Sequence, residues 1–85
     1  MTKKEVLRDI RELTVAGRVR VTSHGRSRMS QRGVTYADLR HGLINANDCE
    51  AGESGRWRVW TTDMCGDSLT VILVIQDGIL IVTVF

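Results

Sequence analysis

The stretch RWRVWTTDMCGDSLTVILVIQDGILIVTVF, residues 56–85, decides the fold. Runs of β-branched and aromatic residues bounded by turn residues are typical of strands, and three such runs occur here. We expect strands at residues 56–62, 68–75 and 79–85. Asp77-Gly78 is a two-residue hairpin signal between the last two runs. The middle run contains VILVI, which predicts that this strand is buried on both faces.

Helical patterns precede these strands. At residues 2–16, Thr2 and Glu5 have the spacing of a capping box, and apolar residues recur on one side until Gly17 ends the helix. Residues 18–22, RVRVT, then alternate between basic and apolar side chains, which predicts a short strand.

Two further helices are expected after this short strand. The first begins with Ser23 as N-cap and ends at Gly33, a residue suited to the C′ position. The second begins at Thr35, with Asp38 placed to support its N-terminus. Residues 45–55 are rich in turn residues and acidic charge and are therefore expected to form a loop.

This order of elements predicts an α+β fold in a single domain over residues 1–85. We expect two to three N-terminal helices packed on one face of a small antiparallel sheet of three to four strands. The length supports one thin hydrophobic core, and 42% hydrophobic with 26% charged residues is ordinary for a globular domain.

Charge is distributed unevenly along the chain. Residues 1–42 carry ten Lys or Arg and four Asp or Glu, whereas residues 43–85 carry two Arg and six Asp or Glu. The basic N-terminal half favours an anionic partner. The charged N-terminus lacks the apolar core of a signal peptide, and no apolar run is long enough to span a membrane. We therefore expect a cytoplasmic protein without a membrane partner.

The two cysteines have no spacing typical of a zinc site. Cys49 and Cys65 both stand in loop-like sequence, and neither has a basic neighbour that would activate a thiolate. Free thiols are the favoured interpretation, a disulfide is second, and a catalytic thiol is third. We expect no metal and no cofactor.

The helix expected after Ser23 carries a histidine and two arginines on one stripe. His24, Arg28 and Arg32 are spaced i, i+4, i+8, so each step turns by only about 40° around the helix. An imidazole exchanges protons near neutral pH, and guanidinium donors fit phosphate oxygens. The stripe is therefore the candidate catalytic site for a phosphate substrate, although a solvated helix surface gives the same spacing.

The strand at residues 56–62 offers a second candidate surface. Alternation places Arg56, Arg58 and Trp60 on one face, where bases stack and phosphates bind. The alternative is that Trp60 covers a helix and both arginines are solvated. The residues expected to contact nucleic acid are Arg56, Arg58, Trp60, Tyr36 and Thr83.

The segment HGRSRMSQRGV, residues 24–34, resembles the HAxxRMxxRGI signature of the domain of unknown function 4258 family. The segments GRWRV at 55–59 and TVF at 83–85 match its later motifs in order, and the resemblance covers residues 20–85. The segment GRVRVT at 17–22 is similar to MqsR-type toxins. Both groups are similar to RelE-, barnase- and colicin-like ribonucleases, whose fold packs N-terminal helices on a small antiparallel sheet.

The resemblance implies a metal-independent endoribonuclease that acts as a toxin and is held inactive by a cognate antitoxin protein. RNA is then the substrate, His24 the proton-transfer group, and Arg28 with Arg32 the phosphate ligands. The lysines of MqsR-like sites have no counterpart, because the chain has no Lys after Lys4. The alternative function is a non-catalytic nucleic-acid-binding or protein-interaction module, which needs the arginines but not His24.

Overall fold

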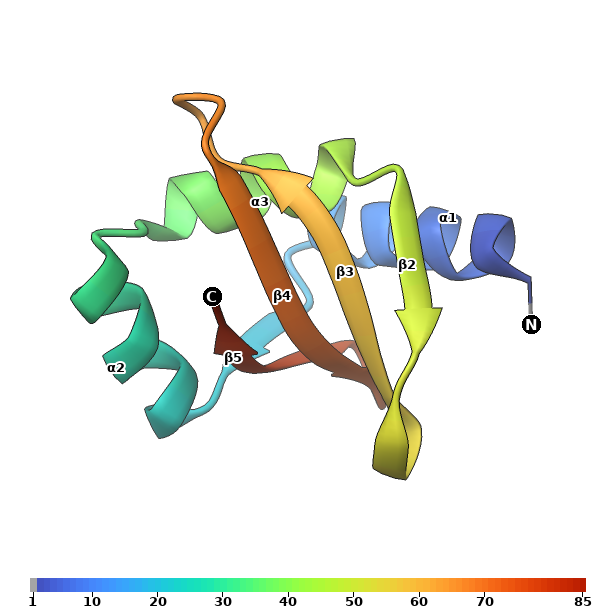
Figure 1. The fold of residues 1–85 in the computed structure, drawn as a ribbon. Helices are drawn as coiled ribbons and strands as arrows, with labels where there is room; N and C mark the ends of the chain where they lie inside the picture. The colour runs from blue at the N-terminus through green and yellow to red at the C-terminus, as the bar shows by residue number, and fades with distance from the viewer. Residues whose placement is uncertain (1) are drawn as a thin grey trace.

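A computed structural model describes residues 2–85 and confirms the α+β class (Figure 1). The α-helices are α1 (Lys3–Val15), α2 (Ser23–Arg32) and α3 (Tyr36–Asn45). The strands are β1 (Val19–Val21), β2 (Asp48–Ala51), β3 (Arg56–Thr62), β4 (Ser68–Ile75) and β5 (Ile79–Val84), with a short 3₁₀ turn η1 (Glu53–Gly55) before β3. The five strands form one sheet in the order β1-β5-β4-β3-β2.

The sheet differs from the predicted one in size and in strand direction. It has five strands rather than three to four, and β1 pairs with β5 in parallel, whereas every other pair is antiparallel. Strand β2 lies in the segment that was expected to be a loop. Its sequence DCEA places only Cys49 in the core, opposite Val59 of β3, so this edge strand lacks an alternating apolar pattern.

The core lies between one face of the sheet and the helices α1 and α3, which are behind the sheet in Figure 1. The face turned to the viewer is not covered by a helix. This one-sided packing corrects the expectation that β4 is buried on both faces: Val71 and Leu73 are fully buried, whereas Ile72 and Val74 are half-buried. The buried hydrophobic residues are Val6, Ile10, Met29, Val34, Leu39, Leu43, Ala46, Cys49, Val59, Leu69, Val71, Leu73, Ile79, Ile81 and Val84.

The helix ends agree with the capping signals at all but one position. Thr2 with Glu5 forms a capping box on α1, and Thr35 with Asp38 forms another on α3. Hydrogen bonds from the backbone and hydroxyl of Thr35 and from the Met64 amide lower the pKa of the Asp38 carboxyl. The N-cap of α2 is Thr22 rather than the predicted Ser23.

Thr22 directly follows β1 and is held against β5. Its amide donates to the Ile81 carbonyl (3.0 Å) and its hydroxyl donates to the Val82 carbonyl (2.9 Å), while the same hydroxyl accepts from the Gly25 amide (3.0 Å). The first turn of α2 is therefore held directly against β5. A Cβ on Gly25 would lie 3.1 Å from the Ile81 oxygen, so the glycine permits this close approach.

The turn between β4 and β5 contains three residues rather than the predicted two. Ile75 pairs with Ile79, which leaves Gln76, Asp77 and Gly78 in the turn. Asp77 and Gly78 both have positive φ, at 55° and 105°. Gly78 is buried against the start of β1, where an added Cβ would lie 2.8 Å from the Arg18 carbonyl oxygen.

Among residues 2–85, the structure has no helix with the length and apolar character needed to cross a bilayer.

We predict that Gly78→Ala lowers the free energy of unfolding by about 1–3 kcal/mol more than Gly66→Ala does, because it adds a clash inside a packed turn. Both glycines have positive φ, so both substitutions share the conformational cost of about 1–3 kcal/mol. Of these two glycines, only Gly78 has a backbone oxygen within 4 Å of the added Cβ. At Gly66 no atom lies within 4 Å of the added Cβ. Urea unfolding of the two variants measures the difference, and equal losses would contradict it.

Candidate functional site

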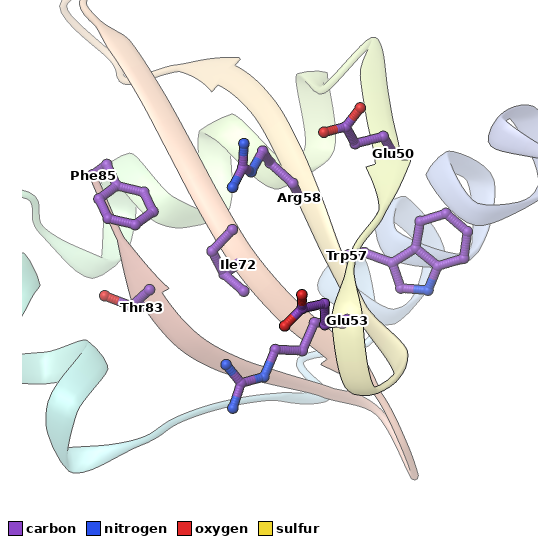
Figure 2. Close-up of a pocket in the computed structure, with 9 residues that line it drawn as sticks. Glu50, Glu53, Trp57, Arg58, Ile72, Thr83 and Phe85 are labelled. Atoms are coloured by element: carbon purple, nitrogen blue, oxygen red, sulfur yellow. The ribbon is translucent and has the colours of Figure 1, made fainter.

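The uncovered face of the sheet carries the arginines of β3. Val59 is fully buried on the helix-covered face, and Trp57 packs against the same core, which confirms the predicted alternation along β3. Arg56 and Arg58 are exposed on the opposite face. Figure 2 shows the Arg58 side chain over the sheet and Trp57 on the other side of the strand.

A hollow of about 490 Å³ lies over this face. It crosses the sheet from β2 to the end of β5, with Ile72 of β4 between the charged side chains and Phe85 (Figure 2). Its lining residues are Glu50, Gly52, Glu53, Arg56, Trp57, Arg58, Ile72, Thr83 and Phe85.

The hollow contains both guanidinium and carboxylate groups that are not paired with each other. Glu50 stands directly opposite Arg58 in the β2–β3 register, and Glu53 precedes Arg56 in the adjoining turn. Among residues 2–85, the ion pairs within 4.0 Å are Lys3–Asp48 and Arg18–Asp77, and neither involves the hollow. Its charged groups are therefore available to a ligand.

Thr83 lies within the hollow and faces the same side as Ile72, its partner in the β4–β5 register. Its hydroxyl oxygen is shielded from solvent and has no hydrogen-bond partner in the described part of the chain. A buried hydroxyl without a partner is unfavourable, so a ligand that reaches this oxygen gains a hydrogen bond at little further desolvation cost.

Arg28 of α2 lies beside the end of the hollow that is formed by Phe85, and Arg32 contacts the start of β4. Arg28 is half-buried: its Nε donates to the Val84 carbonyl (3.3 Å), and its guanidinium carbon lies 5.8 Å from the centre of the Phe85 ring. Arg32 is exposed and donates from Nη2 to the Ser68 carbonyl at 3.4 Å. The stripe of α2 therefore runs along the sheet beside Phe85.

His24 is exposed in the first turn of α2, one helical turn before Arg28. Its ring makes no hydrogen bond within residues 2–85 and does not line the hollow. The ring is therefore accessible to a ligand that extends beyond the hollow toward α2.

The structure brings some of the predicted residues together and separates others. Arg56, Arg58 and Thr83 line one hollow, with Arg28 at its Phe85 end. Trp60 is half-buried and outside the lining. Tyr36 lies apart, in a different hollow with Arg26 and β1.

Six lining residues were not predicted as site residues from the sequence: Glu50, Gly52, Glu53, Trp57, Ile72 and Phe85. The placement of Glu50 opposite Arg58 depends on β2, which has no apolar pattern. Phe85 was noted in the sequence as the end of a strand and of the TVF segment, but not as a site residue. The sequence signal that could have identified this end of the hollow is the aromatic residue directly after the last strand.

The cysteines take no part in this surface. Both are free; Cys65 is exposed in a turn, and Cys49 is buried in the core. Burial raises the pKa of the Cys49 thiol above its usual value, which disfavours the reactive thiolate. Within residues 2–85, no three His, Cys, Asp or Glu side chains come together in a group that could hold a metal ion.

Comparison with known proteins does not assign the chain to a group. No family model, no curated protein and no solved structure matches it.

We predict that Arg28→Ala lowers the free energy of unfolding by about 1–2 kcal/mol, because it removes a charged hydrogen bond to β5 and a cation–π contact. Arg32→Ala is the matched control, since Arg32 is exposed and its one hydrogen bond is long. We expect it to change stability by less than about 0.5 kcal/mol. Thermal unfolding measures both, and an Arg28 variant as stable as the Arg32 variant would show that the β5 contact is weak.

Proposed function

We propose that the protein is a metal-independent endoribonuclease that binds RNA on the open face of its sheet. The observation that carries the proposal is the contact between Arg28 and Phe85, which joins two surfaces that carry arginines. One is the hollow, where Arg56 and Arg58 stand beside Glu50 and Glu53, and the other is the stripe of α2 with His24.

The chemistry of this surface suits single-stranded RNA. Guanidinium groups bind phosphate oxygens with two donors at once, and aromatic rings stack on unpaired bases. Sheet faces with exposed basic and aromatic side chains are used in this way by RNA-binding modules. Phe85 is 47% exposed, so its ring is accessible to a base.

Cleavage requires a group that takes the proton of the ribose 2′-hydroxyl, and His24 is our candidate. In the proposed step the imidazole takes that proton while the 2′ oxygen bonds to phosphorus. The P–O5′ bond then breaks, and the 5′ oxygen takes a proton from water. The products are a 2′,3′-cyclic phosphate and a 5′-hydroxyl end. Arg28 and Arg32 stabilise the charge on the phosphate in the transition state.

The resemblance to the domain of unknown function 4258 family, and to MqsR- and RelE-type toxins, supports the same activity. We propose that the protein acts in the cytoplasm as a toxin, and that a cognate antitoxin protein binds its basic half and blocks RNA. A net charge of +6 over residues 1–42 supports an acidic surface on that partner.

A non-catalytic RNA-binding module is the second candidate. It is favoured by the hydrogen bonds that Arg28 and Arg32 already make to carbonyls of the sheet and by the position of His24 outside the hollow. Such a module needs Arg56 and Arg58 but not the histidine.

We predict that His24→Ala lowers the rate of RNA cleavage by about 10²–10⁴-fold, because it removes the proton-transfer group. RNA affinity changes little, since the arginines are retained. His41→Ala is the matched control: His41 is also exposed, but it lies on α3, and we expect full activity. Cleavage of a labelled oligoribonucleotide in chelator, with analysis of the product ends, measures the effect. Wild-type cleavage by the His24 variant would contradict the mechanism, and RNA binding without cleavage by the wild type would favour the module.

We predict that Arg58→Gln weakens RNA binding and makes the slope of log affinity against log salt less steep by about 0.7, the value for one phosphate contact on a single strand. Arg8→Gln makes the same charge change on α1, away from the hollow. We expect the Arg8 variant to keep the wild-type slope. Fluorescence anisotropy titrations over a range of salt concentrations give both slopes, and equal slopes for the two variants would place the RNA elsewhere.

A further inference from the structure

Four side chains of different character form a row across the open face of the sheet (Figure 2). Glu50 stands opposite Arg58, Arg58 opposite Ile72, and Ile72 opposite Thr83, so the row crosses β2, β3, β4 and β5. Directly opposite residues of antiparallel strands share a face of the sheet, and their Cα atoms lie about 4.5–5.5 Å apart. All four residues line the hollow. A ligand laid along the row therefore meets a carboxylate, a guanidinium, an aliphatic side chain and a hydroxyl group, in that order.

The first two members of the row carry opposite charges that are not paired within the protein. Glu50 and Arg58 are both exposed, and the ion pairs within 4.0 Å among residues 2–85 do not include them. An α-amino acid carries an ammonium and a carboxylate group on one carbon, so these two groups reach two neighbouring side chains. The ammonium pairs with Glu50 and the carboxylate pairs with Arg58. An RNA strand, by contrast, offers phosphates to Arg58 but no ammonium group to Glu50.

The other two members of the row suit an aromatic side chain with a polar tip. Ile72 is half-buried in the middle of the row, and a ring placed over it buries apolar surface. Phe85 lines the same hollow and is 47% exposed, so its ring is available for a second aromatic contact. The Thr83 hydroxyl oxygen is shielded from solvent and has no hydrogen-bond partner in the described part of the chain. A hydroxyl group at the tip of the bound ring gives it that partner.

The length of the row fits one such amino acid. From Arg58 on β3 to Thr83 on β5 there are two strand spacings, about 9–10 Å. The skeleton of tyrosine, with a hydrogen bond of about 2.8 Å at each end, is long enough to join the two residues. Alanine or serine bound by the same charged groups ends over Ile72 and leaves the Thr83 hydroxyl without a partner.

We propose that this row is a binding site for a free aromatic α-amino acid, with tyrosine as the preferred ligand. Glu50 binds the ammonium group, Arg58 binds the carboxylate, and Thr83 binds the phenol hydroxyl. The site goes beyond the proposed function, because its ligand is a small zwitterion rather than RNA. Bound tyrosine covers Arg58, so it also competes with any RNA that enters the hollow.

The test measures binding of four ligands to the full chain by NMR titration: L-tyrosine, L-phenylalanine, N-acetyl-L-tyrosine and L-tyrosinamide. Relative to L-tyrosine, the second lacks the hydroxyl, the third lacks the ammonium group, and the fourth lacks the carboxylate. We expect L-tyrosine to bind about 2- to 10-fold more tightly than L-phenylalanine, the contribution of one neutral hydrogen bond. Loss of either charged group weakens binding by at least about tenfold, the contribution of a hydrogen bond to a charged group.

Two variants assign the contacts to their residues. Thr83→Val removes a hydroxyl that has no partner in the described chain, so the fold is retained, and L-tyrosine and L-phenylalanine then bind equally. Glu50→Gln weakens L-tyrosine binding by at least about tenfold and does not weaken N-acetyl-L-tyrosine binding. Glu12→Gln makes the same charge change on the exposed surface of α1 and is the matched control, with wild-type affinity for L-tyrosine.

Equal affinities of the wild type for the four ligands would overturn the site, as would the absence of L-tyrosine binding up to its solubility limit. A Thr83 variant that still prefers L-tyrosine, with a native-like spectrum, would overturn the hydroxyl contact and with it the choice of tyrosine. The nuclease proposal is separable from these results, because no RNA is present in the titrations. RNA cleavage without tyrosine binding supports the nuclease and overturns this site, whereas tyrosine binding without cleavage supports the site and overturns the nuclease.

Discussion

The arrangement of the site depends on the hydroxyl group of Thr22. It donates to the Val82 carbonyl of β5 and accepts from the Gly25 amide of α2, so one atom joins the edge of the sheet to the start of the helix. The Thr22 amide extends the β1–β5 pairing by one further bond, to Ile81. After Thr22 the chain no longer pairs with β5 as a strand, and helix α2 packs along β5 instead. The stripe of α2 lies beside the open face because the helix begins here.

The second constraint is that the helices supply only enough apolar surface for one face of the sheet. Helices α1 and α3 pack together and cover one face, and α2 lies along β5. The opposite face keeps half-buried aliphatic side chains such as Ile72 and Val74, beside exposed arginines. A surface that is apolar at its centre and charged at its rim is typical of a ligand site. The thin core of a short chain therefore accounts for the presence of an uncovered sheet face.

Local sequence signals predicted most of the elements. The strands at residues 56–62 and 68–75 have the predicted bounds, and both capping boxes formed, because each depends on neighbouring residues. The parallel pairing of β1 and the existence of β2 depend on distant partners and left no local pattern. For the same reason, alternation along β3 placed Arg58 on the correct face, but its neighbour Glu50 was missed. Tyr36 was assigned to the site from its residue type alone, and the structure places it with β1 instead.

The contacts of Arg28 serve both stability and the proposed chemistry. Its Nε caps a carbonyl of β5, and its Nη1 donates to Gln31 at 3.1 Å, so the guanidinium is held in one orientation against Phe85. A charged group that is already oriented loses less conformational freedom when a phosphate binds, and it stabilises a transition state without reorganising. Arg32, with one long hydrogen bond, has no such support. The two arginines of the stripe therefore differ in function: Arg28 is the fixed phosphate ligand of the proposed site, and Arg32 is an adjustable one.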